Sequence, residues 1–235
     1  MAFMRDYTVY STTGGTAATE HELISEMNLT TEENDIIALL INIDSTKSCT
    51  VDGFTAKFNQ TGNACRQYLF WRRVGAGEEN MAIPNAVLSG SDNMSAIAWS
   101  VVGCPTTGDP MGVLGATNTQ TASSPKFKSI TGMDQYSIVF SMGTADKRPF
   151  QSDARYQLKD TKMITTVSSA GSGSESVHGF LGSTFIHESG MTIVEDTHAL
   201  TASDGVHTRR VEFLDAHSQN SAIAPRIPTY VLDTP

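Results

Sequence analysis

The chain has 235 residues, enough for one large domain or two small ones, and enough to bury a core without disulfides or metals. Charged residues make up only 17% of it, against about 25% in a typical soluble domain, and its formal net charge is −9. This low charge excludes a coiled coil, and a hydrophobic content of 39% argues against disorder. With 16 Lys and Arg in total and no basic run longer than a pair, we expect no nucleic-acid binding.

No apolar run approaches the length needed to span a membrane. The longest run, Ile36 to Ile41, has the length of a strand, and the N-terminus lacks the apolar centre of a secretory signal peptide. The cysteines Cys49, Cys65 and Cys104 do not have zinc-site spacing. Their pattern leaves two interpretations open, namely three small buried thiols or one Cys49–Cys65 disulfide.

The first quarter of the chain gives mixed signals. Residues 1–20 have the character of an arm, with Tyr7, Val9 and Tyr10 as anchors. A short helix over 20–27, capped by Thr19, and an irregular strand with a loop are equally compatible with the next segment.

From residue 35 onward, alternating and β-branched runs predict strands separated by Gly, Pro and Ser turns. Several runs are apolar on both faces, as expected for central strands of a sandwich. The predicted strands cover 35–43, 49–58 with a break at Gly53, 66–74, 95–104, 135–143, 154–159, 163–169, 177–187, 191–200 and 207–216.

These elements predict an all-β fold, an antiparallel β-sandwich that is jelly-roll-like, with an extended N-terminal arm and C-terminal tail. We expect residues 1–235 to form a single domain with its core at about 30–216. The Ser- and Gly-rich stretch 168–176 is interpreted as a long hairpin loop rather than a linker. Residues 217–235 are expected to be an extended tail, because Pro225, Pro228 and Pro235 disfavour helix before them.

The sequence shows no motif of an active site, so we predict no catalytic, cofactor-binding or metal-binding residues and no cofactor. Five histidines recur in the C-terminal third. Two of them bracket acidic residues, which leaves a metal site conceivable, but we expect each histidine to sit half-exposed near a strand end. Ser183 and Ser189 lie near histidines without forming a hydrolase pattern, and Trp71 and Trp99 are expected in the core. The histidines are His178, His187, His198, His207 and His217, and the acidic residues are Glu188, Glu195 and Asp196.

The order of several segments resembles that of a family of tailed-phage sandwich proteins, over about residues 11–216. In that family a buried strand follows a Gly-Asp turn, which is Asn34-Asp35 here. Residues 102–105 read Val-Gly-Cys-Pro where the family has Arg-Gly-Val-Asp. The segments that carry the resemblance are STTGGTAA (11–18), EEND (32–35), DIIALLINI (35–43), LFWRRVGAGEE (69–79), AIAWSVVGCPTTGDPMGV (96–113), KSITGMDQYSIVFSMGTAD (128–146) and VHTRRVEFLDA (206–216).

The resemblance implies a non-enzymatic component of a phage particle. We expect a capsid decoration (cement) protein, located in a virion that is assembled in the host cytoplasm. Its expected partners are the major capsid or other virion proteins and further copies of itself, as a trimer or on a lattice. The alternatives are a tail or fibre component, a carbohydrate- or receptor-binding module, and a glycan-cleaving enzyme. An aromatic ring exposed beside a carboxylate in a groove would favour sugar binding, and two carboxylates about 5–9.5 Å apart in a cleft would favour the enzyme.

Overall fold

Two antiparallel sheets form the centre of the molecule. The computed structural model describes residues 1–12, 17–62, 64–151, 162–169 and 176–216, and these contain strands and no helix. The first sheet has the order β1-β8-β3-β6-β5, and the second has the order β10-β18-β13-β15-β14, with β9 also paired to β18. The strands of the first sheet are β1 (Phe3–Ser11), β3 (Ile36–Ile43), β5 (Thr55–Gly62), β6 (Cys65–Arg73) and β8 (Met94–Val102). Those of the second are β9 (Met111–Leu114), β10 (Asn118–Ala122), β13 (Ile138–Ala145), β14 (Lys162–Ser168), β15 (His178–Phe185) and β18 (Asp204–Phe213).

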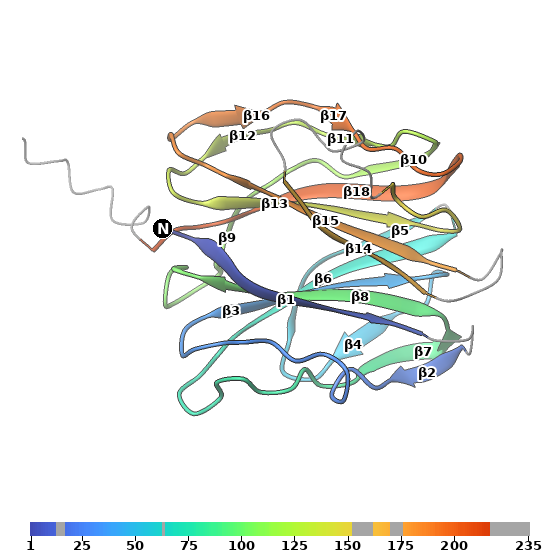
Figure 1. Ribbon diagram of the computed structural model, residues 1–235, viewed down its shortest axis with the longest axis horizontal. Coiled ribbons are helices and arrows are strands. Elements are labelled where there is room, and N and C mark those ends of the chain that lie inside the picture. Colours follow the sequence, from blue (N-terminus) through green and yellow to red (C-terminus); the bar gives the residue numbers. More distant parts are fainter. Residues whose placement is uncertain (13–16, 63, 152–161, 170–175, 217–235) are drawn as a thin grey trace, which may run out of the picture.

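Smaller sheets cover the outer faces of both central sheets, so the molecule has four layers (Figure 1). A three-stranded sheet of β2 (Ala18–His21), β7 (Ala86–Asp92) and β4 (Cys49–Val51) covers the first sheet. Two short pairs cover the second, namely β11 (Lys126–Phe127) with β17 (Asp196–Thr197), and β12 (Ile130–Met133) with β16 (Met191–Ile193). Because both faces of β3 and β13 are covered, every residue of these two strands is buried. This explains why their sequences are apolar throughout instead of alternating.

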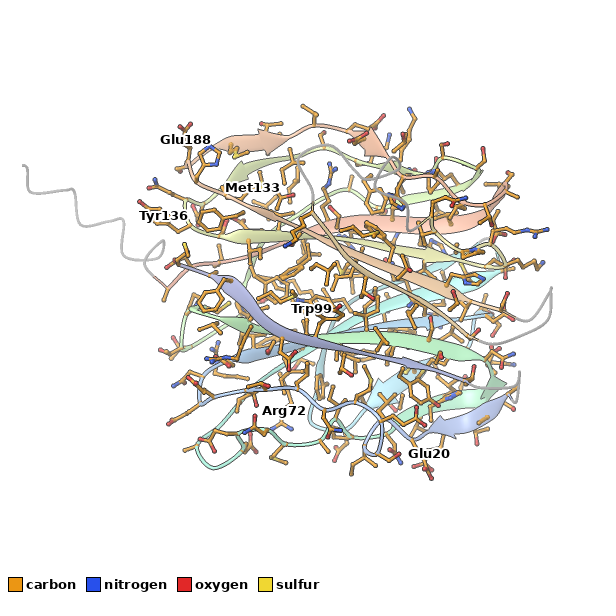
Figure 2. All side chains as sticks on the ribbon, in the orientation of Figure 1. Glu20, Arg72, Trp99, Met133, Tyr136 and Glu188 are labelled. Carbon is orange, nitrogen blue, oxygen red and sulfur yellow. The ribbon has the colours of Figure 1, made fainter. Side chains whose placement is uncertain are left out.

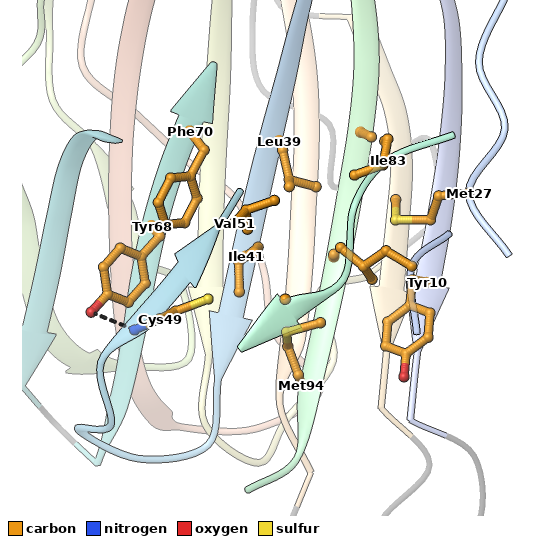
Figure 3. Close-up of a cluster of buried hydrophobic side chains, with 14 of the residues drawn as sticks. Tyr10, Met27, Leu39, Ile41, Cys49, Val51, Tyr68, Phe70, Ile83 and Met94 are labelled. Carbon is orange, nitrogen blue, oxygen red and sulfur yellow. Dashed lines mark hydrogen bonds between the residues drawn. The ribbon is translucent and has the colours of Figure 1, made fainter. Parts of the chain in front are cut away.

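The apolar core is divided by the layers. The central cluster lies between the two main sheets and includes Trp99, whose ring centroid lies 5.1 Å from that of Phe140 and 6.4 Å from that of Phe213. Figure 2 shows Trp99 in the middle of the stack. A second cluster fills the space under the three-stranded cover, where the Cys49 N–H donates to the Tyr68 hydroxyl (Figure 3). Two further clusters lie under the short pairs of the second sheet.

The two main sheets are built to one topology. In each sheet the strands follow the same order, so that β1, β3, β5, β6 and β8 correspond to β9–β10, β13, β14, β15 and β18. The outer sheets also come from corresponding parts of the chain. β2 follows β1 and β7 precedes β8, just as β11 and β12 follow β10 and β16 and β17 precede β18, whereas β4 lies between β3 and β5. Residues 3–102 are therefore called the first repeat and residues 111–213 the second repeat.

The registers of β3, β5, β6 and β8 coincide residue by residue with those of β13, β14, β15 and β18. Ile36 pairs with Val101 and Arg73, and its counterpart Ile138 pairs with Phe213 and Phe185. A bulge at Lys57 in β5 is matched by one at Ile164 in β14. Such agreement in bulge position as well as in pairing shows that the repeats share backbone geometry and not only strand order.

The turn before β3 and the turn before β13 also have the same conformation. Asn34 and Tyr136 occupy equivalent positions and have φ values of 70° and 65°. Their N–H groups donate to the carbonyl oxygens of Val74 and Ile186, which are again equivalent, at 2.9 and 2.7 Å. Asparagine tolerates a left-handed conformation, whereas tyrosine rarely adopts one, so the fold imposes this turn on the second repeat.

The repeats face one another across an approximate twofold axis. Contacts between strands are reciprocal: β15 contacts β3 as β13 contacts β6, and β14 contacts β8 as β18 contacts β5. Near the axis, equivalent residues meet directly, since the Thr144 hydroxyl donates to the Asn42 side-chain oxygen. The duplicated sheets therefore bury the same face against each other.

The all-β antiparallel sandwich is confirmed, with two differences from the expected details and one open alternative decided. Residues 3–11 and 18–21 belong to sheets, so the expected N-terminal arm at 1–20 is wrong for these residues. Of the two interpretations of residues 20–27, the irregular strand with a loop is confirmed: the end of β2 is followed by a turn in which the Met27 N–H donates to Leu23 O, and no helix forms. The jelly-roll-like connectivity is not confirmed, because each sheet is built from one half of the chain.

The later predicted elements are also partly revised. The strand expected over 191–200 is broken into β16 and β17, with Val194 exposed between them. β14 pairs with β15, as a hairpin joined by 168–176 requires. The strand predicted at 154–159 and the tail at 217–235 lie outside the described residues.

Candidate interaction surface

A groove opens on the side of the molecule where the edge strands β1 and β14 meet. β1 ends the first sheet, β14 ends the second, and the two strands contact each other. The groove has a volume of about 420 Å³, and the described residues that line it are Met4, Tyr7, Ile138, Lys162, Met163, Ile164 and Ser183. Its lining is therefore mainly apolar, with Lys162 as its charged member.

β1 presents apolar side chains to solvent along this edge. Phe3, Tyr7 and Val9 are 43%, 43% and 41% exposed. Within the described part of the chain, β8 is the one strand paired with β1, so the other side of β1 is free. The bulge at Arg5 blocks part of this edge, since the Asp6 carboxylate accepts the N–H groups of Tyr7 and Thr30. Bulges of this kind limit unwanted strand pairing, which leaves the stretch from Tyr7 to Ser11 as the accessible part.

The groove lies where a large side chain of the first repeat is replaced by a small one in the second. Ser183 pairs with Phe140, and its counterpart Trp71 pairs with Ala38. On the opposite side of the sandwich the half-buried Trp71 packs against the central cluster. Lys57, the counterpart of Ile164, forms an ion pair with Asp109, which helps to cover this position. A serine thus stands where the other repeat has a tryptophan, and the space of an aromatic side chain is left open.

The opposite side of the sandwich is sealed by further contacts. The Nε2–H of His207 donates to the carbonyl oxygens of Gly62 and Cys65, at 2.8 and 3.0 Å. The guanidinium of Arg209 lies over the Phe58 ring, 4.5 Å from its centroid. His207 and Arg209 come from the second repeat and their partners from the first, so this side joins the repeats whereas the β1–β14 side is open.

The histidines do not assemble into a reactive site. His178, His198 and His207 are buried rather than half-exposed, and burial lowers the pKa of each. Their ring nitrogens bond to protein groups, such as Ser168 for His178 and Gln151 O for His198, both at 2.8 Å. The expectation of half-exposed histidines is therefore wrong for these three, which tie strands and loops together.

The conceivable metal site around His187 and His198 is not formed. His198 lies between the Phe150 and Phe180 rings, whereas His187 is exposed. The Glu195 carboxylate is held by Lys126 and Lys128 at 3.0 and 2.8 Å. Across the described ranges, no group of three or more His, Cys, Asp and Glu side chains could hold a metal ion, and His217 falls outside these ranges.

A shallow acidic hollow lies near the start of β2. Tyr10, Glu20, Glu22 and Glu26 line it together with His21. The Tyr10 ring is buried, and its hydroxyl lies 3.3 Å from His21 Nδ1. Burial, with a smaller effect of Glu26 and Glu22, raises the pKa of Tyr10. Because this ring is not exposed for stacking, the hollow does not meet the condition for a sugar site.

The cysteines are free thiols and not a disulfide. Cys49, Cys65 and Cys104 are all buried. Burial raises the pKa of Cys49 and of Cys104 to about 12, and it also raises the pKa of Cys65. The thiolate is the reactive form of cysteine, so these three thiols are unreactive at neutral pH.

A carboxyl pair joins the two repeats beside the approximate twofold axis. Asp44 follows β3, Asp146 occupies the equivalent position after β13, and the two side chains hydrogen-bond each other. Asp92 lies nearby, and Lys147 forms an ion pair with Asp146 at 3.3 Å. Burial, together with Asp146 and Asp92 and against the effect of Lys147, raises the pKa of Asp44 to about 8.

This raised pKa predicts that the contribution of Asp44 to stability falls with increasing pH, opposite in sign to the contributions of the three buried histidines, whose pKa values are lowered. The folded chain holds the proton on Asp44 more tightly than the unfolded chain, whose carboxyl titrates near pH 4. The stabilisation is thus complete below pH 4 and is lost as the pH rises through 8. We expect a loss of about 1–2 kcal/mol between pH 5 and 8.5, because the pair is only partly buried and water screens it.

Urea unfolding of the wild type and of Asp44→Asn at pH 5 and pH 8.5 measures this contribution, as the difference between the pH dependences of the two proteins. Asp52→Asn, at an exposed carboxylate, is the control and should keep the wild-type difference. An Asp44→Asn protein with the same pH dependence as the wild type would contradict the assignment of the proton to this pair.

Comparison with protein-family models, with curated proteins and with solved structures finds no match for this chain. None of the described residues forms a helix of the length and apolarity that a membrane crossing requires.

Proposed function

We propose that the protein is a non-enzymatic structural protein that acts by binding neighbouring subunits through its β1–β14 face. The observation that carries this proposal is the open apolar groove beside an unpaired edge strand with three exposed apolar residues. Exposed apolar patches and free strand edges are features of protein interaction sites. The lining favours a protein segment over a sugar, because the described lining residues include no carboxylate.

The finer form of the proposal is a component of a phage particle, most simply a capsid decoration protein. The order of segments that resembles tailed-phage sandwich proteins supports it. A surface low in charge also suits contacts that are repeated among many copies and with the major capsid protein, because charged residues are depleted in the cores of protein interfaces. A position in the tail or fibre is the alternative within the same class.

Self-association gives the direct test. We expect the wild type to sediment as an oligomer at micromolar concentrations, with a trimer as the simplest state. Val9→Lys places a charge on the free edge of β1 and should shift the protein to monomers, raising the dissociation constant at least tenfold, since edge lysines oppose strand pairing. Sedimentation velocity over a concentration series measures the change.

Val87→Lys is the matched control, because Val87 is 48% exposed on β7 in the outer layer of the first repeat. It should leave the oligomer intact. A wild type that remains monomeric at every concentration, or equal effects of the two variants, would contradict self-association through the β1–β14 face.

A further inference from the structure

The groove between β1 and β14 has the shape of a missing aromatic side chain. Trp71 fills the equivalent space on the other side of the sandwich, and Ser183 leaves it open here. The remaining lining side chains are long and apolar, apart from Tyr7 and Lys162. The occupant that fits is therefore an aromatic or similarly large side chain on a short extended segment.

The chain itself contains such a segment. Residues 217–235, outside the described residues, include one aromatic residue, Tyr230, followed by Val231, Leu232 and Asp233. The run from Thr229 to Leu232 is rich in residues that favour strands.

The described chain ends next to the groove of its own copy. The Ala216 N–H donates to Gly103 O at 2.8 Å, and the ammonium group of Met1 pairs with Asp215. The last described residue, Ala216, therefore lies beside the first residues of the chain, and Met4 of β1 lines the groove. Fully extended, the stretch from Ala216 to Tyr230 spans roughly 45 Å. β1 itself is only about 30 Å long.

If fully extended, this length of chain would carry Tyr230 past the groove of its own copy. Pro225 and Pro228 disfavour a tight reversal, because the residue before a proline is pushed to extended backbone. We propose that the segment around Tyr230 of one copy docks in the β1–β14 groove of a neighbouring copy. Contacts of this kind are head-to-tail, so they build a closed ring or a continuing lattice. The inference rests on the proposed function, because it names the partner of the same surface.

Thiol crosslinking between two singly substituted proteins tests the docking. Lys162→Cys places a thiol on the rim of the groove, and Thr229→Cys places one beside Tyr230 while keeping that ring. The three native thiols are buried and should not react. When the two proteins are mixed with a short bismaleimide, we expect a mixed covalent dimer at a yield at least tenfold above that with Val87→Cys in place of Lys162→Cys.

Two variants identify the aromatic contact. Adding Tyr230→Ala to the tail protein, or Ser183→Trp to the groove protein, should bring the yield down to that of the Val87→Cys control. Ser183→Trp fills the groove as Trp71 fills its counterpart. A yield that these variants do not change would overturn the proposal.

The doubly substituted chain, Lys162→Cys with Thr229→Cys, shows whether the tail in the groove belongs to the same copy or to a neighbouring copy. A covalent dimer supports docking between copies, whereas a crosslink within one chain at low concentration would overturn it in favour of the chain's own tail. No crosslinking above the Val87→Cys control would overturn docking altogether. Wild-type sedimentation is read independently: an oligomer without crosslinks refutes the tail contact alone, and a monomer refutes the proposed function.

Discussion

Trp99→Ala should destabilise the protein by about 3–5 kcal/mol, among the largest effects of any single substitution in this chain. Trp99 is completely buried in β8 of the first repeat, and its ring contacts Phe140 and Phe213 of the second. Removing the indole would leave a cavity between two sheets whose outer faces are already covered, so neither sheet can move inward easily. Equilibrium unfolding in urea at constant pH measures the loss.

Two matched variants make the test specific. Trp99→Phe should cost only about 1 kcal/mol, because the indole N–H has no acceptor among the described residues and its removal relieves a buried unsatisfied donor. Trp71→Ala should cost about 1–2 kcal/mol, since Trp71 is only half-buried at the edge of the same cluster. If Trp99→Ala cost no more than Trp71→Ala, the central cluster would not be what holds the repeats together.

Strand positions could be predicted from the sequence because burial leaves a local signal. The run from Ile36 to Ile43 is apolar throughout, and this correctly predicted a strand covered on both faces. The break at Gly53, which has a φ of 69°, was also visible as a turn residue between two runs. Where the local signal is weak the sequence left alternatives open, as at residues 20–27, where apolar spacing fits a helix but tertiary packing buries Leu23 and Met27 without one.

The duplication could not be predicted in the same way. The two repeats share strand pairing, bulges and turns, and many different side chains are compatible with these features. They share few identical residues at equivalent positions. Ile36 corresponds to Ile138, but Asn34 corresponds to Tyr136 and Trp71 to Ser183. Equivalent positions are known only when the registers are known. The groove follows from one such difference, so no motif search along the chain could have located it.

The repeats also differ in which carboxylate stabilises the turn before β3 and the turn before β13. In the first repeat the Asp35 carboxylate, within the turn itself, accepts the Glu32 N–H at 2.9 Å and the Arg5 guanidinium at 3.0 Å. In the second repeat Ser137 stands at the position of Asp35, and the carboxylate comes from Glu212 in β18, at the position of Ser100. One buried carboxylate is present in each case, supplied by a different strand.

Glu212 is placed as a structural residue and not as a catalytic one. It is 1% exposed, and it accepts the N–H groups of Val113 and Asp134 at 2.8 and 2.6 Å, with the Ser137 hydroxyl at 2.7 Å. Gly112 lies so close to this carboxylate that a Cβ there would collide with it. Both carboxylate oxygens of Glu212 thus accept hydrogen bonds from β9 and from the turn at residues 134–137, and neither oxygen is exposed to bind a substrate.

Glu212→Ala should therefore cost about 3–5 kcal/mol, because the N–H groups of Val113 and Asp134 lose their acceptor together and a cavity is left, although the Ser137 hydroxyl can still donate to Asp134 O. Glu212→Gln keeps one acceptor oxygen but turns an amide N–H₂ toward the Val113 N–H, so about 1–2 kcal/mol is expected. Glu195→Ala, which removes exposed ion pairs to Lys126 and Lys128, should cost far less than Glu212→Ala, because water screens these pairs. Urea unfolding ranks the three variants, and hydrogen exchange should show the largest loss of protection for Glu212→Ala at β9 and residues 134–137. Equal costs for Glu212→Ala and Glu195→Ala would mean that the second repeat holds this turn without the carboxylate of β18.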